Sequence, residues 1–505
     1  MHRKLTLSLL TIIALLSSCK DDDKSVPDEQ IVAENPASFK ESASIDLGGT
    51  AASEISAYDA VTKRLFVVNN EGSSKVEVVD MSKFPTVTKI QTIDFSANSG
   101  GANSVAVFNG QLAVALEALN KQDNGSISII NTSSLQEIKR VTVGALPDMV
   151  AFSPDGRYIV SANEGEPNDL YTIDPIGTVS IIDLKNNYSV KTLDFSAFES
   201  SKAGLLNAGF RVYGLNATVA KDVEPEYVAI SSDSKKAFVT LQENNGVAEI
   251  NLETGTITKV IPLGVKDISL AANAFDVSDK DNKKELKTWP LKAYYLPDAI
   301  AYFTLGATEY LILANEGDTR AYTGFNEEVR VKDIKLDAVR FPDAINLKKD
   351  ENLGRLLVAK FSGDIDGDGD HDEIYTTGGR SATIVNPVTG AIVAEIGKDL
   401  EERVIASGNY DDDRSDNKGV EVEGVTVGQI NGLTVLFIGM ERSDMIAVYD
   451  ISKPESPKFL QLFQTGDAPE GLLYIKPKDS PNGRSLLIVS SEGDGMVKFY
   501  QPDKL

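Results

Sequence analysis

The sequence predicts an all-β protein, a β-propeller, and three observations carry this prediction. Short apolar runs separated by turn residues recur along the 505-residue chain, as expected for short antiparallel strands. A unit of three such runs repeats in tandem, and a fourth run follows most copies. No long stretch shows the 3.6-residue periodicity of a helix. Tandem units of four antiparallel strands are the blades of a propeller.

The clearest copy of the repeat spans residues 146–184. It contains apolar runs at 149–152, 158–162 and 178–184, and a Pro-Asp-Gly turn at 154–156 joins the first two. Each run is too short to bury its faces alone, so the unit needs neighbours on both sides. This requirement favours a closed ring of similar units over an isolated sheet.

Eight copies of the unit align along the chain, and they begin at residues 54, 103, 146, 226, 298, 355, 423 and 470. The sixth copy, 355–396, is atypical. We therefore favour eight blades and keep seven as the alternative if this copy is an insertion. The last copy ends at its third strand, and an orphan strand at 38–47 precedes the first copy. We expect this N-terminal strand to complete the last blade and close the ring.

Two long insertions interrupt the repeat, at about 195–223 and 266–296. The first has the apolar spacing of a short helix, and the second contains Trp289, the only tryptophan. Insertions of this length usually lie over one face of a ring and often contribute to binding. Residues 38–505 are thus predicted to form a single propeller domain with two excursions.

The N-terminus has the features of a secretion signal. A basic stretch at 2–4 precedes an apolar run at 5–16, which is too short to span a membrane. The run ends in Leu-Ser-Ser-Cys, which resembles a bacterial lipobox with Cys19 as the lipidated residue. The alternative is an ordinary cleaved signal with an unrelated cysteine. We predict a lipoprotein signal peptide at 1–18 and a flexible tether at 19–37.

The segment after the cysteine, Lys-Asp-Asp-Asp-Lys at 20–24, resembles an acidic signal for export to the outer face of the outer membrane. We therefore expect an outer-membrane lipoprotein that is exposed at the cell surface and touches the membrane only through its lipid. We also expect a monomer.

Charge and residue usage restrict the chemistry. The formal net charge is −25, and a surface this negative repels phosphate backbones, so nucleic acid is excluded as a partner. Divalent cations and basic ligands suit it better. Cys19 is the only cysteine, and His371 is the only histidine outside the signal. This usage argues against disulfides and histidine-ligated zinc.

The sharpest motif is an acidic loop at 364–373. Aspartates occupy alternate positions, with Gly369 at the sixth position, like the front of an EF-hand loop. Position twelve is Tyr375 instead of glutamate, and an acid at position nine makes the loop similar to those of integrin-type propellers. We predict a structural Ca²⁺ site; the alternative is a solvated acidic turn, and we expect His371 to face outward. The predicted ligands are Asp364, Asp366, Asp368, Asp370 and Asp372.

A second group of acids emerges only from the repeat. In most copies the first strand begins at an acid and the middle strand ends on a glutamate. These two positions share one edge of an antiparallel pair, and the first strand of a propeller blade lines the axis. We expect the acids to surround the channel mouth. The predicted ligand face consists of Asp148, Glu164, Glu166, Glu226, Asp298, Glu316, Asp318, Arg320, Arg380, Glu423, Glu441, Glu470 and Glu492.

So many like charges require cations, arginine partners or raised pKa values. Alternatively, each acid could cap backbone amides or pair with a neighbouring blade, and the acids would then have only a structural role. If the face is functional, the favoured hypothesis is a binding module for an extracellular small molecule, glycan or protein. The alternative is a calcium-dependent phosphoesterase whose metal activates water, with Arg320, Arg380 or Arg442 holding phosphate oxygens. The sequence contains no Gly-x-Ser-x-Gly nucleophile motif.

Several motifs together resemble one family. They are ANEGEPND (162–169), DVEPEYVAIS (222–231), LPDAIA (296–301), ANEGDTR (314–320), DIDGDGDHDEIY (364–375), GGRS (378–381) and SDNKGVEVEGV (415–425). In this order they are similar to the choice-of-anchor I proteins, over roughly residues 45–501. The resemblance implies a secreted or anchored bacterial propeller, and some members are labelled alkaline-phosphatase-like. Val422 departs from the pattern, where the family tends to have proline.

Overall fold

The computed structural model describes residues 32–505. The predicted signal peptide, Cys19 and most of the predicted tether lie outside the described residues. The fold is all-β, as predicted, with eight sheets. Within the described chain, no helix has both the length and the apolar character needed to cross a bilayer.

Seven of the sheets have four antiparallel strands. The first four blades follow the chain in order. Their strands are β2 (Ser56–Asp59), β3 (Arg64–Asn69), β4 (Lys75–Lys83) and β5 (Thr86–Asp94); β6 (Ala102–Phe108), β7 (Gln111–Leu116), β8 (Asn124–Asn131) and β9 (Glu137–Ala145); β10 (Pro147–Phe152), β11 (Tyr158–Asn163), β12 (Thr178–Asp183) and β13 (Ser189–Leu193); and β14 (Pro225–Ile230), β15 (Lys236–Leu241), β16 (Gly246–Asn251) and β17 (Thr256–Pro262).

The last three blades are less regular in sequence. Their strands are β20 (Ile300–Leu305), β21 (Thr308–Asn315), β25 (Ser381–Asn386) and β26 (Ala391–Ile396); β27 (Val422–Ile430), β28 (Leu433–Met440), β29 (Met445–Asp450) and β30 (Lys458–Gln464); and β31 (Pro469–Ile475), β32 (Leu486–Ser491), β33 (Met496–Gln501) and β1 (Lys40–Asp46). β1 pairs antiparallel with β33, so the N-terminal strand completes the last blade, as predicted.

The innermost strands form a closed ring. Contacts join β2, β6, β10, β14, β20, β27 and β31 in this order, and β31 contacts β2. The number of sheets equals the eight predicted repeats, whereas the ring has seven members. This is the arrangement that the sequence left open, in which the sixth copy is not a blade of its own.

The sixth copy is divided between two sheets. Its last two strands, β25 and β26, complete the fifth blade, where Leu311 in β21 pairs with Val385 in β25. Its first part joins a five-stranded sheet made of β18 (Val265–Asp267), β19 (Lys292–Tyr294), β24 (Tyr375–Thr376), β23 (Leu357–Ala359) and β22 (Glu328–Arg330). The predicted insertion at 266–296 is therefore one part of a larger excursion that has its own sheet.

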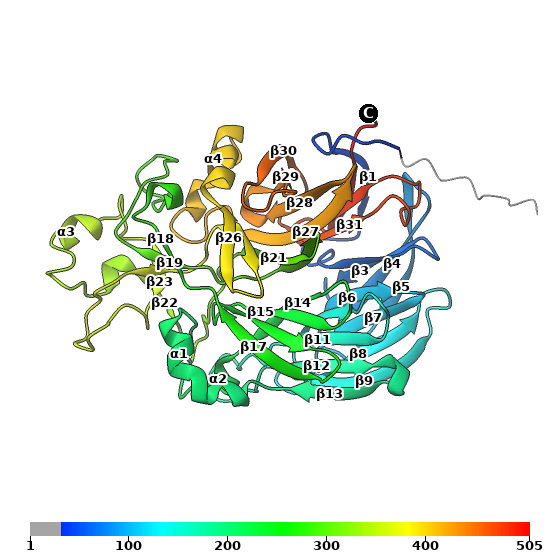
Figure 1. The fold of residues 1–505 in the computed structure, drawn as a ribbon, viewed down its shortest axis with the longest axis horizontal. Helices are drawn as coiled ribbons and strands as arrows, with labels where there is room; N and C mark the ends of the chain where they lie inside the picture. The colour runs from blue at the N-terminus through cyan, green and yellow to red at the C-terminus, as the bar shows by residue number, and fades with distance from the viewer. Residues whose placement is uncertain (1–31) are drawn as a thin grey trace, which may run out of the picture.

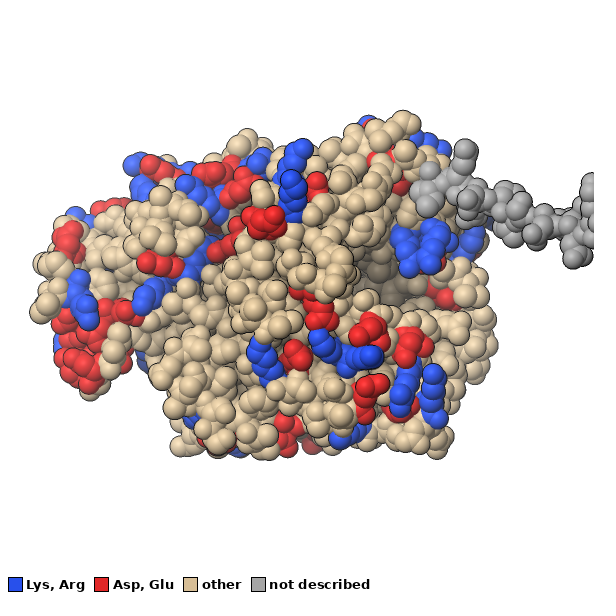
Figure 2. Space-filling model, viewed as in Figure 1, with Lys and Arg blue, Asp and Glu red and all other residues tan. Residues whose placement is uncertain are grey.

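The excursion lies to one side of the ring, at the left of Figure 1. It carries α3 (Ala344–Leu347) and its own core, which includes Ile268, Phe275, Val331 and Leu353. Acidic side chains gather at its outer end (Figure 2). The remaining helices are α1 (Lys202–Asn207), α2 (Val219–Asp222) and α4 (Lys398–Ser407), with short 3₁₀ turns at Leu184–Asn186, Ser196–Ser201, Ala271–Asn273, Val331–Asp333, Asp412–Arg414 and Glu441–Ser443.

The main core lies between the blades. Each middle strand is covered on both faces by neighbouring blades, so it reads as a continuous apolar run instead of an alternating one. β28 shows this pattern, since only its first residue escapes full burial. Hydrophobic clusters span adjacent blades; one joins Ile312 of the fifth blade to Leu436 of the sixth.

The predicted tether ends earlier than residue 37. Glu34 is 2% exposed, and its carboxylate accepts hydrogen bonds from Arg484 Nε and from the backbone N–H of Ser485, both at 3.1 Å. Its backbone also forms a bridge with Lys504. Residues 32–37 are thus fixed against the last blade, because burying Glu34 requires these partners.

Candidate functional site: the acid-lined channel mouth

A repeated backbone feature places one polar residue of each blade at the channel. In five blades the inner strand has a register shift near its start, and the extra residues include Asn103, Asp148, Glu226, Glu423 and Glu470. A β-bulge inserts one residue and redirects its side chain. Glu54 and Asp298 hold the equivalent positions in the other two blades, where their backbone N–H groups bond to the neighbouring strand.

The approach to these acids is strained. The residue two places before the acid has positive φ in four blades, at Leu146 (48°), Leu296 (48°), Glu421 (54°) and Ala468 (53°). A non-glycine residue in this region costs on the order of 1–3 kcal/mol and persists only where surrounding structure enforces it. The same backbone conformation recurs in four blades, so it is a regular feature of the channel entrance.

The acids line a cavity of about 320 Å³, which we call the mouth cavity. Its lining is Glu54, Asn70, Asn103, Asp148, Glu423, Glu441, Glu470 and Glu492. Six of these eight side chains are carboxylates, and in the described part of the chain no lysine or arginine lines the cavity. The repeat therefore concentrates carboxyl groups at one end of the channel.

A second, narrower cavity of about 110 Å³ continues from the first and is called the deep cavity. The two cavities share Asn103, Asp148, Glu423 and Glu470. The remaining lining of the deep cavity is Ile55, Ser104, Met149, Tyr227, Asp298 and Ala299. The channel thus changes from a wide carboxylate mouth to a smaller space with mixed polar and apolar walls.

Burial changes the titration of these acids. Burial raises the pKa of Glu54 to about 8; the hydrogen bond from Asn70 opposes the rise, and the charges of Glu492 and Asp148 add to it. Burial and the neighbouring charge of Glu166 raise the pKa of Asp148 to about 7. Desolvation favours the neutral form of a carboxyl unless a cation compensates its charge.

The same effect acts at four other ring positions. Burial, followed by repulsion from other carboxylates, raises the pKa well above its ordinary value at Glu226, Asp298, Glu423 and Glu470. The Oε2 atoms of Glu226, Glu423 and Glu470 are buried and accept no hydrogen bond. A buried carboxylate oxygen without a partner lowers the stability of the fold. A hydrogen-bond donor or a cation that reached these atoms would restore that stability.

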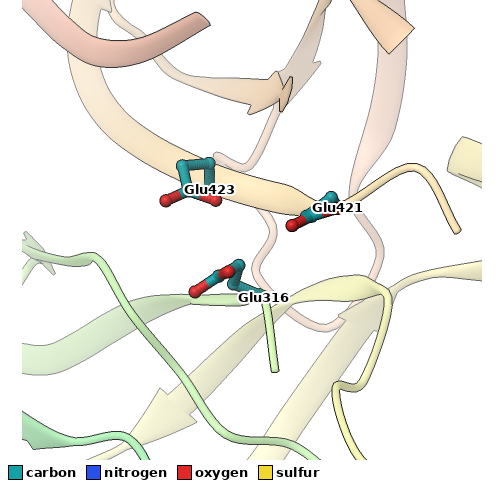
Figure 3. Close-up of side chains that lie close together, drawn as sticks. All are labelled: Glu316, Glu421 and Glu423. Atoms are coloured by element: carbon teal, nitrogen blue, oxygen red, sulfur yellow. The ribbon is translucent and has the colours of Figure 1, made fainter. Parts of the chain in front are cut away.

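Other acids lie around the mouth outside the ring positions, at what we call the rim, and these acids have cationic partners. The rim includes Glu166, Asp222, Glu224, Glu316, Asp318, Glu421 and Glu441. Lys418 Nζ lies 2.6 Å from Glu316 Oε1, 2.9 Å from Asp318 Oδ1 and 3.5 Å from Glu421 Oε1. Figure 3 shows Glu316, Glu421 and Glu423 facing one another, and their carboxylate oxygens lie within 4.8 Å. Because the Lys418 ammonium already serves two of these three acids, the cluster is an ion-pair network and a poor metal site.

The third and sixth blades hold further acids of the predicted face. Burial raises the pKa of Glu164 well above its ordinary value, with Glu166 as the next cause. Glu166 pairs with Lys121 and accepts a hydrogen bond from the Tyr322 hydroxyl at 3.0 Å. Glu441 pairs with Arg442 at 2.7 Å and also lines the mouth cavity.

The two arginines predicted on the ligand face do not belong to it. Arg320 is 1% exposed, and its Nε lies 3.1 Å from Glu224 while its Nη1 lies 3.0 Å from Asp222. Arg380 is equally buried and donates to three backbone carbonyls, those of Asp276, Ser415 and Asn417. Both guanidinium groups fasten the excursions and loops to the ring, and neither is free to contact a ligand.

The acidic loop connects β23 and β24, which pair with each other as Val358 with Thr376. Three predicted ligands, Asp364, Asp366 and Asp372, have oxygens within 4.8 Å of one another. Asp368 accepts the backbone N–H of Asp370, whereas the carboxylate of Asp370 turns away and pairs with Lys335 at 2.8 Å.

His371 does not face outward as expected. Both imidazole nitrogens of His371 are buried and lack a hydrogen-bond partner. The backbone explains the inward position, since the N–H of His371 bonds to the carbonyl of Lys335 at 2.8 Å and holds this residue against the 331–337 segment.

Sequence reasoning missed four residues of the rim. Asp222 and Glu224 hold Arg320, while Lys418 and Glu421 stand beside Glu316. A signal was present, because Glu-Pro-Glu at 224–226 and Glu-Val-Glu at 421–423 place acids on alternate residues at a strand start. The first acid of each pair binds a basic side chain and the second faces the channel.

Comparison with known proteins agrees with this architecture. The model of the choice-of-anchor I domain matches residues 54–454. The chain belongs to the choice-of-anchor I family. The match begins at Glu54, the first acid of the channel ring, and extends into the sixth blade. Membership indicates a propeller protein anchored at the cell surface.

Two curated relatives share 25% identity. One is Gigasin-3a from Magallana gigas, over 189 residues, 31% of this chain and 66% of that protein. The other is a mesenchyme-specific cell surface glycoprotein from Strongylocentrotus purpuratus, over 308 residues, 52% of this chain and 39% of that protein. The chain thus matches less than two thirds of either relative. Kuenenia stuttgartiensis hydrazine synthase shares the fold, with a TM-score of 0.50 and 14% identity over 90% of this chain and 97% of that chain.

Proposed function

We propose that this choice-of-anchor I protein is a lipid-anchored, calcium-stabilised binding module of the outer cell surface that holds a cationic extracellular ligand in its channel mouth. One observation carries the proposal. Six carboxylates surround the mouth cavity, and among the described residues no basic side chain lines it. A positively charged ligand would supply the missing compensation.

The test is cation binding by the purified protein with residue 19 changed to alanine. Calorimetric titrations with Ca²⁺, Mg²⁺ and organic amines, in a buffer free of amines, should reveal at least one cation that binds. Its affinity should fall at least about tenfold when Asp298→Asn and Glu470→Gln are combined. Glu71→Gln is the matched control, because Glu71 is exposed and lies outside both cavities. If no cation binds, or if the double variant binds equally, the proposal is wrong.

The acidic loop supports the calcium part of the proposal. Asp364, Asp366 and Asp372 offer three oxygens at close range, and hard oxygen ligands suit Ca²⁺. Ca²⁺ at 100 times its Kd should stabilise the fold by about 2.7 kcal/mol, visible as a rise in Tm. Asp366→Asn with Asp372→Asn should abolish the rise, whereas Asp370→Asn should retain it, because Asp370 pairs with Lys335. A Ca²⁺ response equal in all variants would contradict the site.

The lipid anchor rests on Cys19 and has a direct test. In a Gram-negative host, the chain should enter the membrane fraction and incorporate labelled fatty acid, and Cys19→Ala should do neither. Protease added to intact cells should degrade the anchored chain if it faces outward. A protein that remains membrane-bound after Cys19→Ala would contradict the anchor.

The phosphoesterase alternative is less well supported. It requires a basic clamp for phosphate, yet Arg320 and Arg380 are buried; Arg320 donates to Asp222 and Glu224, and Arg380 donates to three backbone carbonyls. Only Arg442 remains, and it pairs with Glu421 and Glu441. Hydrolysis of a generic phosphoester that depends on Ca²⁺ and stops with chelator would revive this alternative.

A further inference from the structure

We infer that the cation recognised by the channel mouth is a linear aliphatic polyamine, a molecule whose ammonium groups are separated by methylene segments. This inference rests on the proposed function and names the class of its ligand. The shape of the channel, the spacing of its acids and the lysine partners of some rim acids point to this class.

The channel offers an elongated site with two kinds of wall. The mouth cavity of about 320 Å³ and the deep cavity of about 110 Å³ meet at Asn103, Asp148, Glu423 and Glu470. Beyond this shared belt, the deep cavity adds one more acid, Asp298, together with the apolar side chains Ile55, Met149 and Ala299. An aliphatic chain that enters lengthwise would place ammonium groups at the acids and methylenes along the apolar wall.

Tyr227 strengthens the fit of the deep cavity. Tyr227 lines this cavity; burial raises the pKa of its hydroxyl, and the charges of Asp298, Glu470 and Asp148 add to the rise. An ammonium group over an aromatic face gains a cation–π attraction, which is largest where water is excluded. A bare metal ion would gain nothing from the apolar part of this wall.

The spacing of the acids disfavours a metal ion with several direct carboxylate ligands. Ca²⁺ and Mg²⁺ bind oxygens at about 2.0–2.6 Å, so the oxygens around one ion lie close together. Two groups of three acids in residues 32–505 have oxygens within 4.8 Å, and each contains at most one residue that lines a cavity. Ammonium N–H donors reach acceptors about 2.7–2.9 Å away, and several such groups on one chain match dispersed carboxylates.

The rim supplies an internal precedent. Some acids there pair with primary ammonium groups, Glu316 and Asp318 with Lys418 and Glu166 with Lys121, whereas Glu441 pairs with Arg442. In the two cavities some acceptors are still free, since the buried Oε2 atoms of Glu423 and Glu470 accept no hydrogen bond.

The experiment compares aliphatic amines with one, two and three amino groups against divalent metal ions on the folded protein. Titration calorimetry with spermidine, putrescine, butylamine, Ca²⁺ and Mg²⁺ should show one site that binds spermidine most tightly and butylamine at least about tenfold more weakly than putrescine. Asp298→Asn and Glu470→Gln should each weaken spermidine at least about tenfold, while Glu71→Gln should match the wild type. Circular dichroism and Tm establish that each variant is folded.

The outcomes separate the inference from the proposed function. If Ca²⁺ or Mg²⁺ binds at the mouth and the amines do not, the polyamine inference is overturned and the cationic mouth stands. If no probe binds, both are overturned. If spermidine binds the wild type and both channel variants equally, its attraction is to the acidic surface as a whole and the inference is again wrong.

Discussion

Replacing Glu54 with glutamine should stabilise the ligand-free protein, and the gain should grow with pH. Glu54 lines the mouth cavity, and burial raises its pKa to about 8, with Glu492 and Asp148 adding repulsion. The folded protein therefore keeps a proton on Glu54 that the unfolded chain releases near pH 4.5. Because the folded state binds more protons in this interval, stability falls as the pH rises.

The size of the effect follows from the two pKa values. A rise from 4.5 to about 8 corresponds, at about 1.4 kcal/mol per pKa unit, to at most about 5 kcal/mol lost by the wild type above pH 8. Asn70 Nδ2 donates to both carboxylate oxygens of Glu54, at 3.0 and 3.2 Å; glutamine removes the charge and keeps one oxygen that can accept one of these hydrogen bonds. At pH 5 the free energies of unfolding of the two proteins should agree within about 1 kcal/mol, because Glu54 is protonated and uncharged in the folded wild type.

The assay is urea unfolding at pH 5, 7 and 9 in buffers without divalent ions or amines. Glu54→Gln should exceed the wild type at pH 9, and Glu71→Gln, in the same blade but outside the cavities, should follow the wild type. A bound cation should restore the wild type more than the variant, because it compensates the charge that glutamine lacks. A wild-type stability that stays level or rises between pH 6 and 9 would refute the reasoning.

Two further substitutions test the ion pairs around the mouth by urea unfolding. Arg320→Met should lower the free energy of unfolding by about 3–5 kcal/mol, because it leaves the buried Asp222 and Glu224 without their cation. Arg442→Met changes a partly exposed side chain and should lower it by less than about 1 kcal/mol. Deletion of residues 38–46 removes β1 and exposes the edge of β33, so we expect a lower urea midpoint and aggregation in size-exclusion chromatography. Deletion of residues 1–31 is its control, and equal behaviour of the two truncations would contradict closure by β1.

The sequence predicted the blades well because each blade is local. A strand of four to nine residues, a turn and the next strand are adjacent in the chain, so the repeat at 146–184 already contains the pairing seen between β10, β11 and β12. The closing strand was also predictable, since the last copy lacks a fourth run. The fifth blade was not, because β21 pairs with β25 across an excursion of more than 60 residues, and nothing in either strand specifies that partner.

The sequence predicted the position of the candidate site, but it did not predict which of its charged residues are paired. The repeat alone places Asp148, Glu423 and Glu470 at the channel, where the structure has them. Whether a charged residue is free or paired depends on segments far away in the chain. Arg320 and Lys418 could not be assigned from sequence, because their partners Asp222 and Glu316 lie about 100 residues away. Acids at alternate positions near a strand start indicate such a site in the sequence. Which of the two acids faces inward depends on the β-bulge, and the sequence does not predict the bulge.

Partners distinguish architectural acids from the acids of the mouth. Glu77 and Glu34 are each 1–2% exposed and have full sets of donors: Asn69, Thr92 and Lys89 for Glu77, and Arg484 with the Ser485 N–H for Glu34. If the ring acids only held blades together, they would show the same pattern. Instead, Glu423 and Glu470 keep unpartnered oxygens, although strained residues two places before each acid fix their direction. This difference supports the proposed ligand, because unpaired carboxylates that are aimed into one cavity lower the stability of the fold, and a bound cation would offset that loss.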